Sequence, residues 1–439
     1  MSNYRPISVI SHAVKIFEKC VQTQMLDYFE RHCFISIDQS AYLKHHSTIT
    51  ALHRVYDSWL EEIDNGYVTA VCYFDVDKCF DSLSHDVLLY KLTKYGFSES
   101  SIEYEWCKSY LYKRVQATYC NQSLSSFKRV YSGIPQGSIL GPLLFLMYMN
   151  HLSQGITQCN MYADDIMIYI SSTSVSYACE RLQNDIDRIA SWFHNNKLKV
   201  NLGEDKTSAM VVGTSLRTLT EPNLIYGSSA INLCKSTGYK YLGLNIDSNL
   251  TWTTHVESLC SKLMQRVGVL YRLSHVLPRH CLSSVYVGLI QPLIDYGITL
   301  WGISTQGNIN MVQKYQNRAA MICTGVYDVD VPSETIVSRL KWQNVIQRRY
   351  YLTAVLMFKC INGKSPQNLC DMFDCVNDIH DCNTRNATCN ILHIPRAKTA
   401  YFERSLPFQG AKIWNSLSQQ ERNANNIETF KRLYKLHHS

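Results

Sequence analysis

The sequence predicts an α+β fold, with strands and helices alternating in the first half and helices dominating the second. β-branched and aromatic runs, such as residues 69–76, alternate with segments of helical periodicity up to about residue 250. Beyond residue 255 the apolar residues recur at helical spacing. Candidate helices in this second half cover 255–275, 280–300, 308–323 and 343–361.

In the first half, apolar spacing and the positions of proline and glycine predict individual helices and strands. A helix is predicted over 175–193, where apolar residues recur at steps of three and four. The apolar helix after the GIPQG loop accommodates Pro142 within its first turn. Residues 4–34 are predicted as an extended entry followed by a helix, and further helices are predicted at 47–63, 85–96 and 101–113. Predicted strands are 69–76, a pair within 114–131, a hairpin at 159–170, the end of 201–213, and 239–247; short strands and a final helix are expected over 383–439.

Composition is that of an ordinary folded chain. The 439 residues are 46% hydrophobic and 18% charged, enough for two or three domains with real cores. The net charge of +7 permits a nucleic-acid partner without requiring one. The 17 cysteines are scattered through apolar runs, and the longest apolar run is too short to span a membrane. We therefore expect an intracellular protein, nuclear or cytoplasmic, with no membrane partner.

Acidic residues interrupt two apolar, strand-forming segments. Asp75 lies at the end of the predicted strand 69–76, and Asp164 and Asp165 lie in the turn of the predicted hairpin. If these carboxylates converge in one sheet, they repel one another unless a cation compensates them. Hard oxygen ligands of this kind suit Mg²⁺. Taken alone, the pair Asp164-Asp165 also fits a simple polar hairpin turn.

Further motifs occur around these acids. Tyr162-Ala163-Asp164-Asp165 resembles the catalytic box of reverse transcriptases, and residues 73–81 (YFDVDKCFD) resemble the family's first aspartate motif. Residues 133–142 (GIPQGSILGP) closely resemble its substrate-binding loop and helix. Residues 3–8 (NYRPIS) resemble an early fingers motif, and Tyr241-Leu242-Gly243-Leu244 resembles the primer-grip strand.

Together the motifs resemble a reverse transcriptase of the non-LTR retrotransposon (LINE-like, jockey-like) type that lacks the upstream endonuclease. The resemblance implies a right-hand polymerase with an antiparallel palm sheet. It implies fingers and palm over 1–250, a helical thumb-like region over 251–365 and a mixed tail over 366–439. The implied reaction is the addition of deoxynucleoside triphosphates to a DNA primer on an RNA template.

The resemblance also assigns catalytic roles. Asp75 and Asp164 would ligate two Mg²⁺ ions, with Mn²⁺ as a substitute and Asp165 as a weaker ligand. The carbonyl oxygen of Val76 could touch a metal as well. Lys206 matches the lysine that protonates the leaving pyrophosphate, although a solvated surface lysine fits equally well.

Substrate contacts follow from the same comparison. Phe80 would be the steric gate against the 2′-hydroxyl, or an ordinary core phenylalanine. Gln136 and Gly137 would approach the template–nucleotide pair. Arg5 and Lys44 are candidates for binding the triphosphate, but Leu43 stands where the family commonly has an arginine. Phosphate contacts from the helical region are expected from Lys262, Arg266, Arg272, Arg279, Lys314, Arg318, Arg348 and Arg349.

Other interpretations remain open from the sequence. The chain could be a catalytically weak or inactive remnant that still binds template and primer. A metal-dependent nuclease would also use clustered carboxylates, but it has no need of the GIPQGSILG loop. A C-terminal group of cysteines and a histidine matches no standard zinc spacing: Cys370, Cys375, His380, Cys382 and Cys389.

Overall fold

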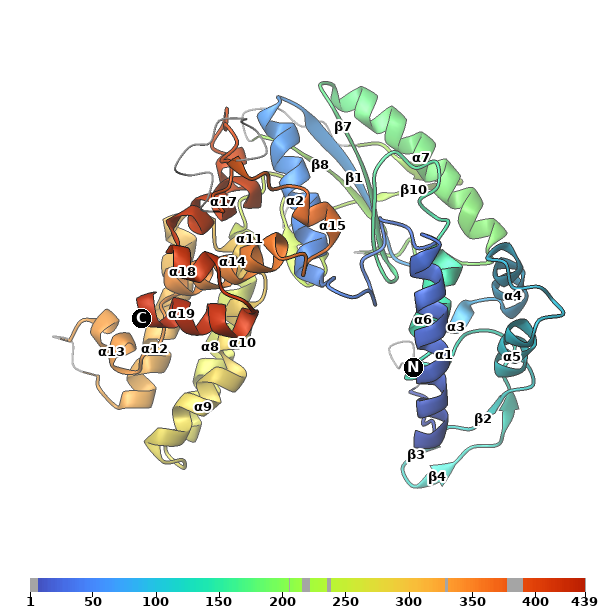
Figure 1. Cartoon of the computed structure of the whole chain (residues 1–439), viewed down its shortest axis with the longest axis horizontal. Coiled ribbons are helices and arrows are strands. Elements are labelled where there is room, and N and C mark those ends of the chain that lie inside the picture. Colours follow the sequence, from blue (N-terminus) through green and yellow to red (C-terminus); the bar gives the residue numbers. More distant parts are fainter. Residues whose placement is uncertain are drawn as a thin grey trace. The chain divides into compact units, whose positions relative to one another are not determined.

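The computed structural model describes residues 7–204, 206–214, 222–234, 238–327, 331–376 and 390–438. These residues form two compact units, each with its own apolar core (Figure 1). The first unit comprises Met1–Lys44, Thr69–Val211 and Thr220–Leu233. The second comprises His45–Val68, Val212–Leu219 and Cys234–Ser439.

A five-stranded sheet forms the centre of the first unit, in the order β11-β8-β1-β7-β6. β6 and β7 form an antiparallel hairpin, and β11 pairs with β8 in parallel. Thr69 at the start of β1 lies 2.9 Å from Ser171 near the end of β7, hydroxyl to hydroxyl, so β1 ends beside the start of β7. The strands are β1 (Val68–Phe74), β6 (Cys159–Tyr162), β7 (Asp165–Ser172), β8 (Ser208–Val212) and β11 (Asn232–Leu233).

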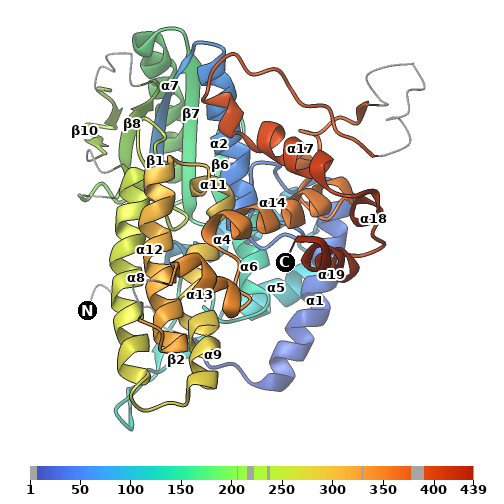
Figure 2. The ribbon, with the colours of Figure 1, turned by 90° about the vertical axis from the view of Figure 1, so that its left-hand side faces the viewer.

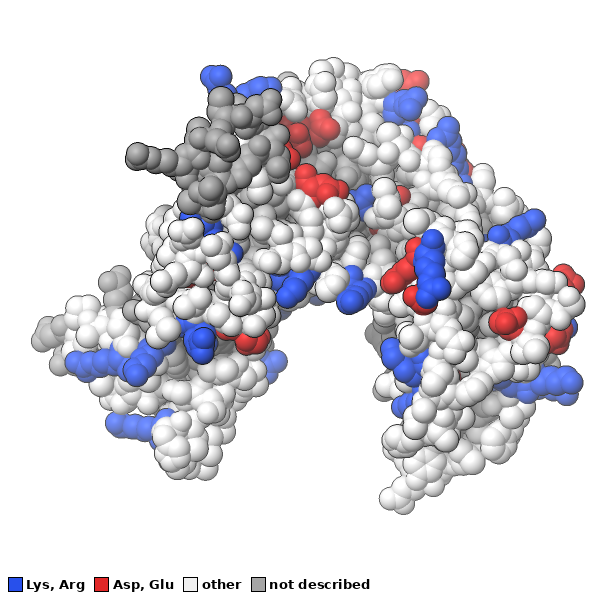
Figure 3. Space-filling model, in the orientation of Figure 1, with Lys and Arg blue, Asp and Glu red and all other residues white. Residues whose placement is uncertain are grey.

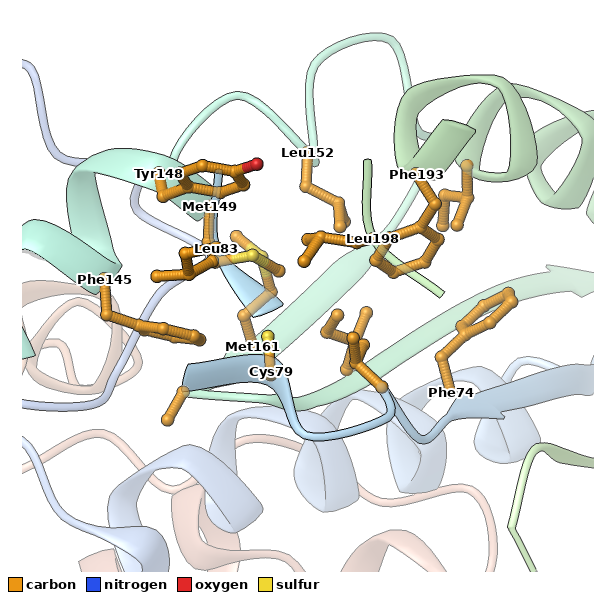
Figure 4. Packing of buried hydrophobic residues seen from close by; sticks show 14 of the residues in the cluster. Phe74, Cys79, Leu83, Phe145, Tyr148, Met149, Leu152, Met161, Phe193 and Leu198 are labelled. Carbon is orange, nitrogen blue, oxygen red and sulfur yellow. The ribbon is translucent and has the colours of Figure 1, made fainter. Parts of the chain in front are cut away.

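The helices of the first unit pack on this sheet or on one another through apolar residues, which form one core with the sheet. α7 buries Leu182, Ile186 and Phe193 and packs along β7. α6 is apolar on every side and almost wholly buried. Figure 4 shows Phe145 of α6 in one cluster with Met161 of β6. The helices are α1 (His12–Arg31), α3 (Cys79–Ser82), α4 (His85–Lys94), α5 (Ile102–Leu111), α6 (Gly141–Met149) and α7 (Val175–Asn195).

Two small antiparallel additions complete the first unit. The segment after α5 forms an arm in which one short strand pair lies inside another, and a further hairpin follows β8. The arm contains β2 (Val115–Gln116), β3 (Tyr119–Cys120), β4 (Ser123–Leu124) and β5 (Lys128–Arg129); the further hairpin is β9 (Ile225–Tyr226) with β10 (Ser229–Ala230).

The second unit is mainly helical. α8 and α12 lie side by side (Figure 2), and α14 packs against α17 and α19. Its two-stranded element is β12 (Tyr239–Tyr241) with β13 (Leu244–Ile246). The helices are α2 (Thr48–Asp64), α8 (Thr253–Leu273), α9 (Arg279–Leu289), α10 (Gln291–Asp295), α11 (Ile298–Trp301), α12 (Gln306–Thr324), α13 (Ser333–Arg339), α14 (Val345–Ile361), α15 (Gln367–Cys370), the 3₁₀ helix η1 (Phe402–Arg404), α17 (Leu406–Ser416), α18 (Gln419–Arg422) and α19 (Ile427–His438).

A buried polar network ties α2 into the second unit. The side chain of Asp57 accepts a hydrogen bond from the backbone N–H of Leu406 at 2.9 Å and lies 3.1 Å from the ring of His53. The other ring nitrogen of His53 lies 2.9 Å from the hydroxyl of Thr299. Because every member of this network has a partner, the polar groups are tolerated in the interior. Residues 45–68 therefore belong with the helices of the second unit, although they precede β1 in the sequence.

Two predictions within residues 239–300 are wrong because turns divide the predicted elements. Residues 239–247, predicted as one strand, form the hairpin β12–β13, with Leu242 and Gly243 at φ +45° and +83° in the turn. Residues 280–300, predicted as one helix, are divided into α9, α10 and α11. Pro292 lies in the first turn of α10, and Gly297 at φ +68° precedes α11.

The prediction of short strands over 383–439 is also wrong for the part that the structure describes. Residues 390–438 contain helices, and the β pairing recorded there is a single bridge between Cys375 and Leu392. The predicted boundary at residue 365 stays a prediction, although α14 on one side of it packs against α17 and α19 on the other. Among the described helices, none has a stretch long and apolar enough to cross a membrane.

Lys91 is an unusual core residue of the first unit and makes its stability depend on pH. It is 8% exposed, donates to the carbonyl oxygen of Tyr148 and lies 4.6 Å from the ring centre of Trp192. Burial lowers the pKa of Lys91 from 10.5 to about 7. The unfolded chain therefore binds a proton that the folded chain lacks between about pH 7 and 10.5, and folding gains stability as the pH rises through this window.

We predict that Lys91→Met raises the free energy of unfolding most below pH 7, by on the order of 3 kcal/mol. The advantage should shrink between pH 7 and 10, because the wild-type lysine loses its charge there. Urea unfolding of both proteins across this range measures the difference. Parallel pH profiles would show that Lys91 stays charged in the folded protein.

Candidate active site

The predicted acids lie at one edge of the central sheet. Asp75 is the first residue after β1, and Asp164 lies in the turn between β6 and β7. Because β1 ends beside the start of β7, Asp75 and Asp164 belong to neighbouring strand ends. Cys79, four residues after Asp75, is close enough to sense Asp164: burial and then this negative charge raise the pKa of its thiol.

The tight turn that presents Asp164 is held from outside the hairpin. Tyr162 pairs with Asp165, so Ala163 and Asp164 form a two-residue turn. Ala163 has φ +58°, a left-handed conformation that costs a residue with a Cβ roughly 1 kcal/mol. The side chain of Gln39 accepts a hydrogen bond from the Ala163 N–H at 3.1 Å. Gln39 also bridges to Met161, so the segment before α2 supports the strained turn.

The chain after Asp75 is fixed by a backbone bridge. The carbonyl oxygen of Asp75 accepts a hydrogen bond from Asn201 N–H at 2.8 Å, and Asp77 N–H donates to the Lys199 carbonyl at 2.9 Å. Val76 and Val200 are therefore a non-hydrogen-bonded antiparallel pair, in which the Val76 carbonyl points away from the segment that contains Val200. The predicted contact of this carbonyl with a metal is compatible with that orientation.

Lys206 lies beside Asp75. Its ammonium nitrogen is 3.6 Å from a carboxylate oxygen of Asp75, and both side chains are partly exposed. The backbone N–H of Asp75 donates to the hydroxyl of Thr207 at 3.2 Å. Lys206 and Thr207 therefore bring a cation and a hydroxyl to the first acid, and Lys206 is not a remote surface lysine.

The loop 132–137 is attached to the segment 80–85. Ile134 N–H donates to the Phe80 carbonyl at 2.9 Å, and Gly133 N–H donates to the Leu83 carbonyl at 2.8 Å. The ring of His85 lies 2.8 Å from the Gly133 carbonyl oxygen. These bonds place the GIPQG loop next to the acid-bearing segment, as two motifs of one site require.

Phe80 and Gln136 both have protein partners. The ring of Phe80 stacks on Phe145 with centroids 4.3 Å apart and an interplanar angle of 12°. The amide of Gln136 donates to Asp81 at 2.9 Å. Gly137 has φ +97° and is exposed, and a Cβ there would lie 3.4 Å from the carbonyl oxygen of Ser8. The stacked Phe80 supports a core role without removing the gate role, because the ring remains partly exposed.

The remaining predicted residues are less well defined. Arg5 lies outside the described residues. Lys44 is exposed in the loop before α2. Asp165 is the exposed first residue of β7, whereas Asp164 is partly buried. Tyr42 lies near Asp164, since burial and then the charge of Asp164 raise the pKa of its hydroxyl.

The donor set suits a hard divalent ion. Asp75, Asp164 and the Val76 carbonyl offer oxygen atoms, the ligands that Mg²⁺ prefers. In the described part of the chain, no group of three or more His, Cys, Asp and Glu side chains is arranged to hold a metal. Mg²⁺ binds few carboxylates and completes its shell with water and phosphate oxygens, so two acids and a carbonyl are a sufficient protein contribution. For the zinc alternative, His380, Cys382 and Cys389 lie outside the described residues.

Some basic residues predicted to bind phosphate are engaged within the second unit. Arg348 forms a bidentate pair with Asp295, with both N–O distances 2.7 Å. Arg349 donates to the Gly302 carbonyl at 3.0 Å and Arg279 to the Thr324 carbonyl at 3.0 Å. Figure 3 shows Lys and Arg at separate places on this face, not in one continuous band. Exposed side chains remain at Lys262, Arg266, Arg272, Lys314 and Arg318.

Sequence reasoning missed two polar residues that organise the site. Gln39 is 2% exposed and supports the Ala163 turn. Glu18 is 1% exposed and accepts hydrogen bonds from Ile139 N–H at 2.7 Å and the Tyr110 hydroxyl at 2.9 Å. Glu18 therefore joins α1 to the residues after the GIPQG loop. Its place among apolar residues of an amphipathic helix was the available signal.

The mixed α and β content, with two acids at neighbouring strand ends, fits a polymerase fold. A family model described as "Reverse transcriptase (RNA-dependent DNA polymerase)" matches residues 1–246. The match covers more than half of the chain, which therefore belongs to the reverse transcriptase family. Enzymes of this family use divalent metal ions.

Curated relatives narrow the membership to mobile elements. The chain is 29% identical over 334 residues to the probable RNA-directed DNA polymerase from transposon BS of Drosophila melanogaster, covering 73% of this chain and 36% of that protein. It is 26% identical to the polymerase from mobile element jockey of the same organism, covering 79% of this chain and 39% of the relative. These relatives confirm the predicted retrotransposon, jockey-like type. The chain spans little more than a third of their length.

Solved structures add little. A telomerase from Candida albicans in complex with a fragment of telomeric RNA has a TM-score of 0.33 and 16% identity, covering 76% of this chain and 57% of that chain. An apo telomerase from Candida tropicalis has a TM-score of 0.37 and 11% identity, covering 76% and 54%. Likeness at this level carries no argument about fold or function.

The attachment of the GIPQG loop can be tested at Gly133. Its φ is +81°, and a Cβ there would lie 2.6 Å from the carbonyl oxygen of Asp81. Gly155, at φ +76°, is a matched control because nothing lies within 4 Å of its added Cβ. We predict that Gly133→Ala lowers the free energy of unfolding by about 2 kcal/mol more than Gly155→Ala. Chemical denaturation measures both, and equal losses would contradict the close approach of the two segments.

Proposed function

We propose that this chain carries the catalytic centre of an RNA-directed DNA polymerase, which adds deoxynucleotides to the 3′-hydroxyl of a DNA primer paired with an RNA template. The observation that supports it best is the position of Asp75 and Asp164 at neighbouring strand ends of one buried sheet. The sheet would be the palm of a right-hand polymerase. Residues 1–250 would supply fingers and palm, and 251–365 a thumb.

Asp75 and Asp164 would hold two Mg²⁺ ions, or Mn²⁺ in their place, with Asp165 as a weaker ligand and Val76 contributing its carbonyl oxygen. Bound divalent ions of this kind stabilise the charge on the attacking and leaving oxygens of phosphoryl transfer. The protein's own contribution is positional. Gln39 keeps the Ala163 turn in its left-handed conformation, and the bridge between Val76 and Val200 fixes the backbone after Asp75.

Lys206 would donate a proton to the leaving pyrophosphate. Its ammonium group, 3.6 Å from Asp75, lies on the acid-bearing side of the sheet edge. The side chain is 49% exposed, so it can move from the carboxylate toward a substrate oxygen. Lys206 would therefore neutralise the charge of Asp75 in the free protein. During nucleotide transfer it would act as the general acid for the leaving pyrophosphate.

Phe80, Gln136 and Gly137 would form the nucleotide-binding surface, with Phe80 under the sugar. The stack on Phe145 restrains the Phe80 ring, which a steric gate needs in order to exclude a 2′-hydroxyl. Arg5 and Lys44 would contact the triphosphate. The β12–β13 hairpin would support the primer, and exposed cations of α8 and α12 would contact duplex phosphates without reading sequence.

We predict that Asp164→Asn abolishes primer extension on an RNA template with Mg²⁺ or Mn²⁺ and leaves template–primer affinity largely intact. The amide keeps the shape but loses the charge that a metal requires. Asp77→Asn is a matched control, because Asp77 is an exposed acid two residues after Asp75. Gel-based extension and anisotropy binding are measured on the same preparations.

The results of that experiment distinguish a polymerase from an inactive binding remnant and from a nuclease. Extension by Asp164→Asn would remove Asp164 from the mechanism. Template–primer binding by the wild-type chain with no extension under any divalent ion would favour the alternative, an inactive template–primer-binding remnant. Cleavage of the nucleic acid in place of extension would indicate a nuclease.

We predict that Phe80→Val raises incorporation of ribonucleotides relative to deoxynucleotides by at least about tenfold, because the smaller side chain leaves room for the 2′-hydroxyl. Loss of the stack on Phe145 will also lower stability, so the readout is the ratio of kcat/KM for the two sugars, which general destabilisation does not change. An unaltered ratio would leave Phe80 as a core residue alone.

A further inference from the structure

The arm after α5 differs from the rest of the first unit because its strands are exposed and pair only with one another. In Figure 1 it extends beyond α5 as the short strands β2 to β4. None of the residues from Tyr112 to Arg129 is buried. The arm is held by its own ladder, in which Val115 pairs with Arg129 and Tyr119 with Leu124. It therefore contributes no side chain to the core that would explain its composition.

The arm carries positive charge without acidic residues. Between Trp106 and Gly133 the sequence contains Lys and Arg but neither Asp nor Glu. Lys113, Lys128 and Arg129 are exposed, and in the described structure none of them has an ion-pair partner. A surface of this kind attracts a polyanion and is not neutralised by the protein itself.

Aromatic rings lie exposed among these cations. Tyr119, Phe127 and Tyr131 are 70%, 68% and 78% exposed. Each of the three rings is without a recorded ring or hydrogen-bond partner among the described residues. Lys128 and Arg129 form β5, and Val130 N–H continues the ladder by donating to the Arg114 carbonyl at 3.0 Å. Phe127 and Tyr131 directly flank this short ladder, so two exposed rings and two exposed cations lie within five consecutive residues.

From this juxtaposition we propose that residues 113–131 bind single-stranded RNA, with unpaired bases stacked on Phe127 and Tyr131 and phosphates held by Lys128 and Arg129. Exposed aromatic rings interleaved with cations are the chemistry that recognises unpaired nucleotides. A duplex hides its base faces and offers only phosphates to such a surface. The choice of RNA rests on the proposed function, in which the template ahead of the primer is the single strand that the protein meets.

The arm offers separable variants with a matched control. Phe127→Ala/Tyr131→Ala removes the rings, and Lys128→Gln/Arg129→Gln removes the charges. Tyr177→Ala/Arg181→Gln changes an exposed aromatic and an exposed cation on α7, in the same unit. Because the altered arm residues are exposed, all variants should fold, and far-UV circular dichroism with thermal unfolding checks this.

The experiment measures fluorescence anisotropy of a labelled single-stranded RNA of mixed sequence, titrated with the full chain without nucleotides at several KCl concentrations. Removing the rings should weaken binding at least about tenfold. Removing the charges should lower the slope of log affinity against log salt by about 1.4, for two phosphates. The α7 control should change neither value. A single-stranded DNA of the same sequence should respond like the RNA, since the contacts leave the 2′-hydroxyl unread.

Three outcomes would overturn the proposal. The arm variants could keep the wild-type affinity and salt slope, or the α7 control could lose as much affinity as they do. The arm variants could also lose affinity for duplex RNA while keeping their affinity for single-stranded RNA. The assay requires no catalysis. Weakened RNA binding in a chain that never extends a primer would reject the proposed polymerase activity and keep the arm. Normal primer extension by the wild-type chain, with RNA binding unaltered in the arm variants, would keep the proposed polymerase activity and reject the role of the arm.

Discussion

The site depends on one constraint, the pairing of β1 beside β7 within the buried sheet. This pairing is what brings Asp75 and Asp164 to the same edge, although 89 positions of sequence separate them. Two carboxylates near one another are electrostatically unfavourable, so the surrounding structure has to supply the free energy that holds them. It does so with an apolar sheet and with helices packed on it, whose burial greatly exceeds the repulsion of a partly solvated pair.

Around this pairing, the site is assembled from backbone hydrogen bonds that join segments distant in sequence. The segment 38–41 supports the turn with Asp164, the segment 199–207 holds Asp75, and the loop 132–137 is attached to residues 80–85. Each of these connections fixes the main chain of a segment that carries a site residue. This arrangement explains why polar residues such as Gln39 and Glu18 are buried: they accept hydrogen bonds from main-chain N–H groups that have no partner in a strand or helix.

Some basic side chains of this chain are paired within the protein, and others are exposed on the arm. Arg348 is held in a bidentate pair with Asp295 and stacks near Tyr351, so it stabilises the helices of the second unit. Lys113, Lys128 and Arg129 of the arm have no ion-pair partner among the residues that the structure describes, and the exposed rings of Phe127 and Tyr131 flank two of them. A count of basic residues therefore says little about nucleic-acid contacts until each cation is known to be engaged or free.

The sequence alone determined the elements whose signals are local: the buried strand β1, the hairpin around Asp164, the amphipathic α7 and the Pro142 start of α6. Their period, turn residues and apolar composition act over a few neighbours, which is why the acid motifs and the family could be identified. It did not determine that residues 239–247 turn at Leu242-Gly243, because the apolar alternation continues across the turn. Only the tertiary structure decided that Gln39 supports Ala163, that Lys206 lies beside Asp75 and that Gln136 bonds to Asp81. Those contacts join residues far apart in the chain, and their free energy arises from packing and desolvation that no local pattern records.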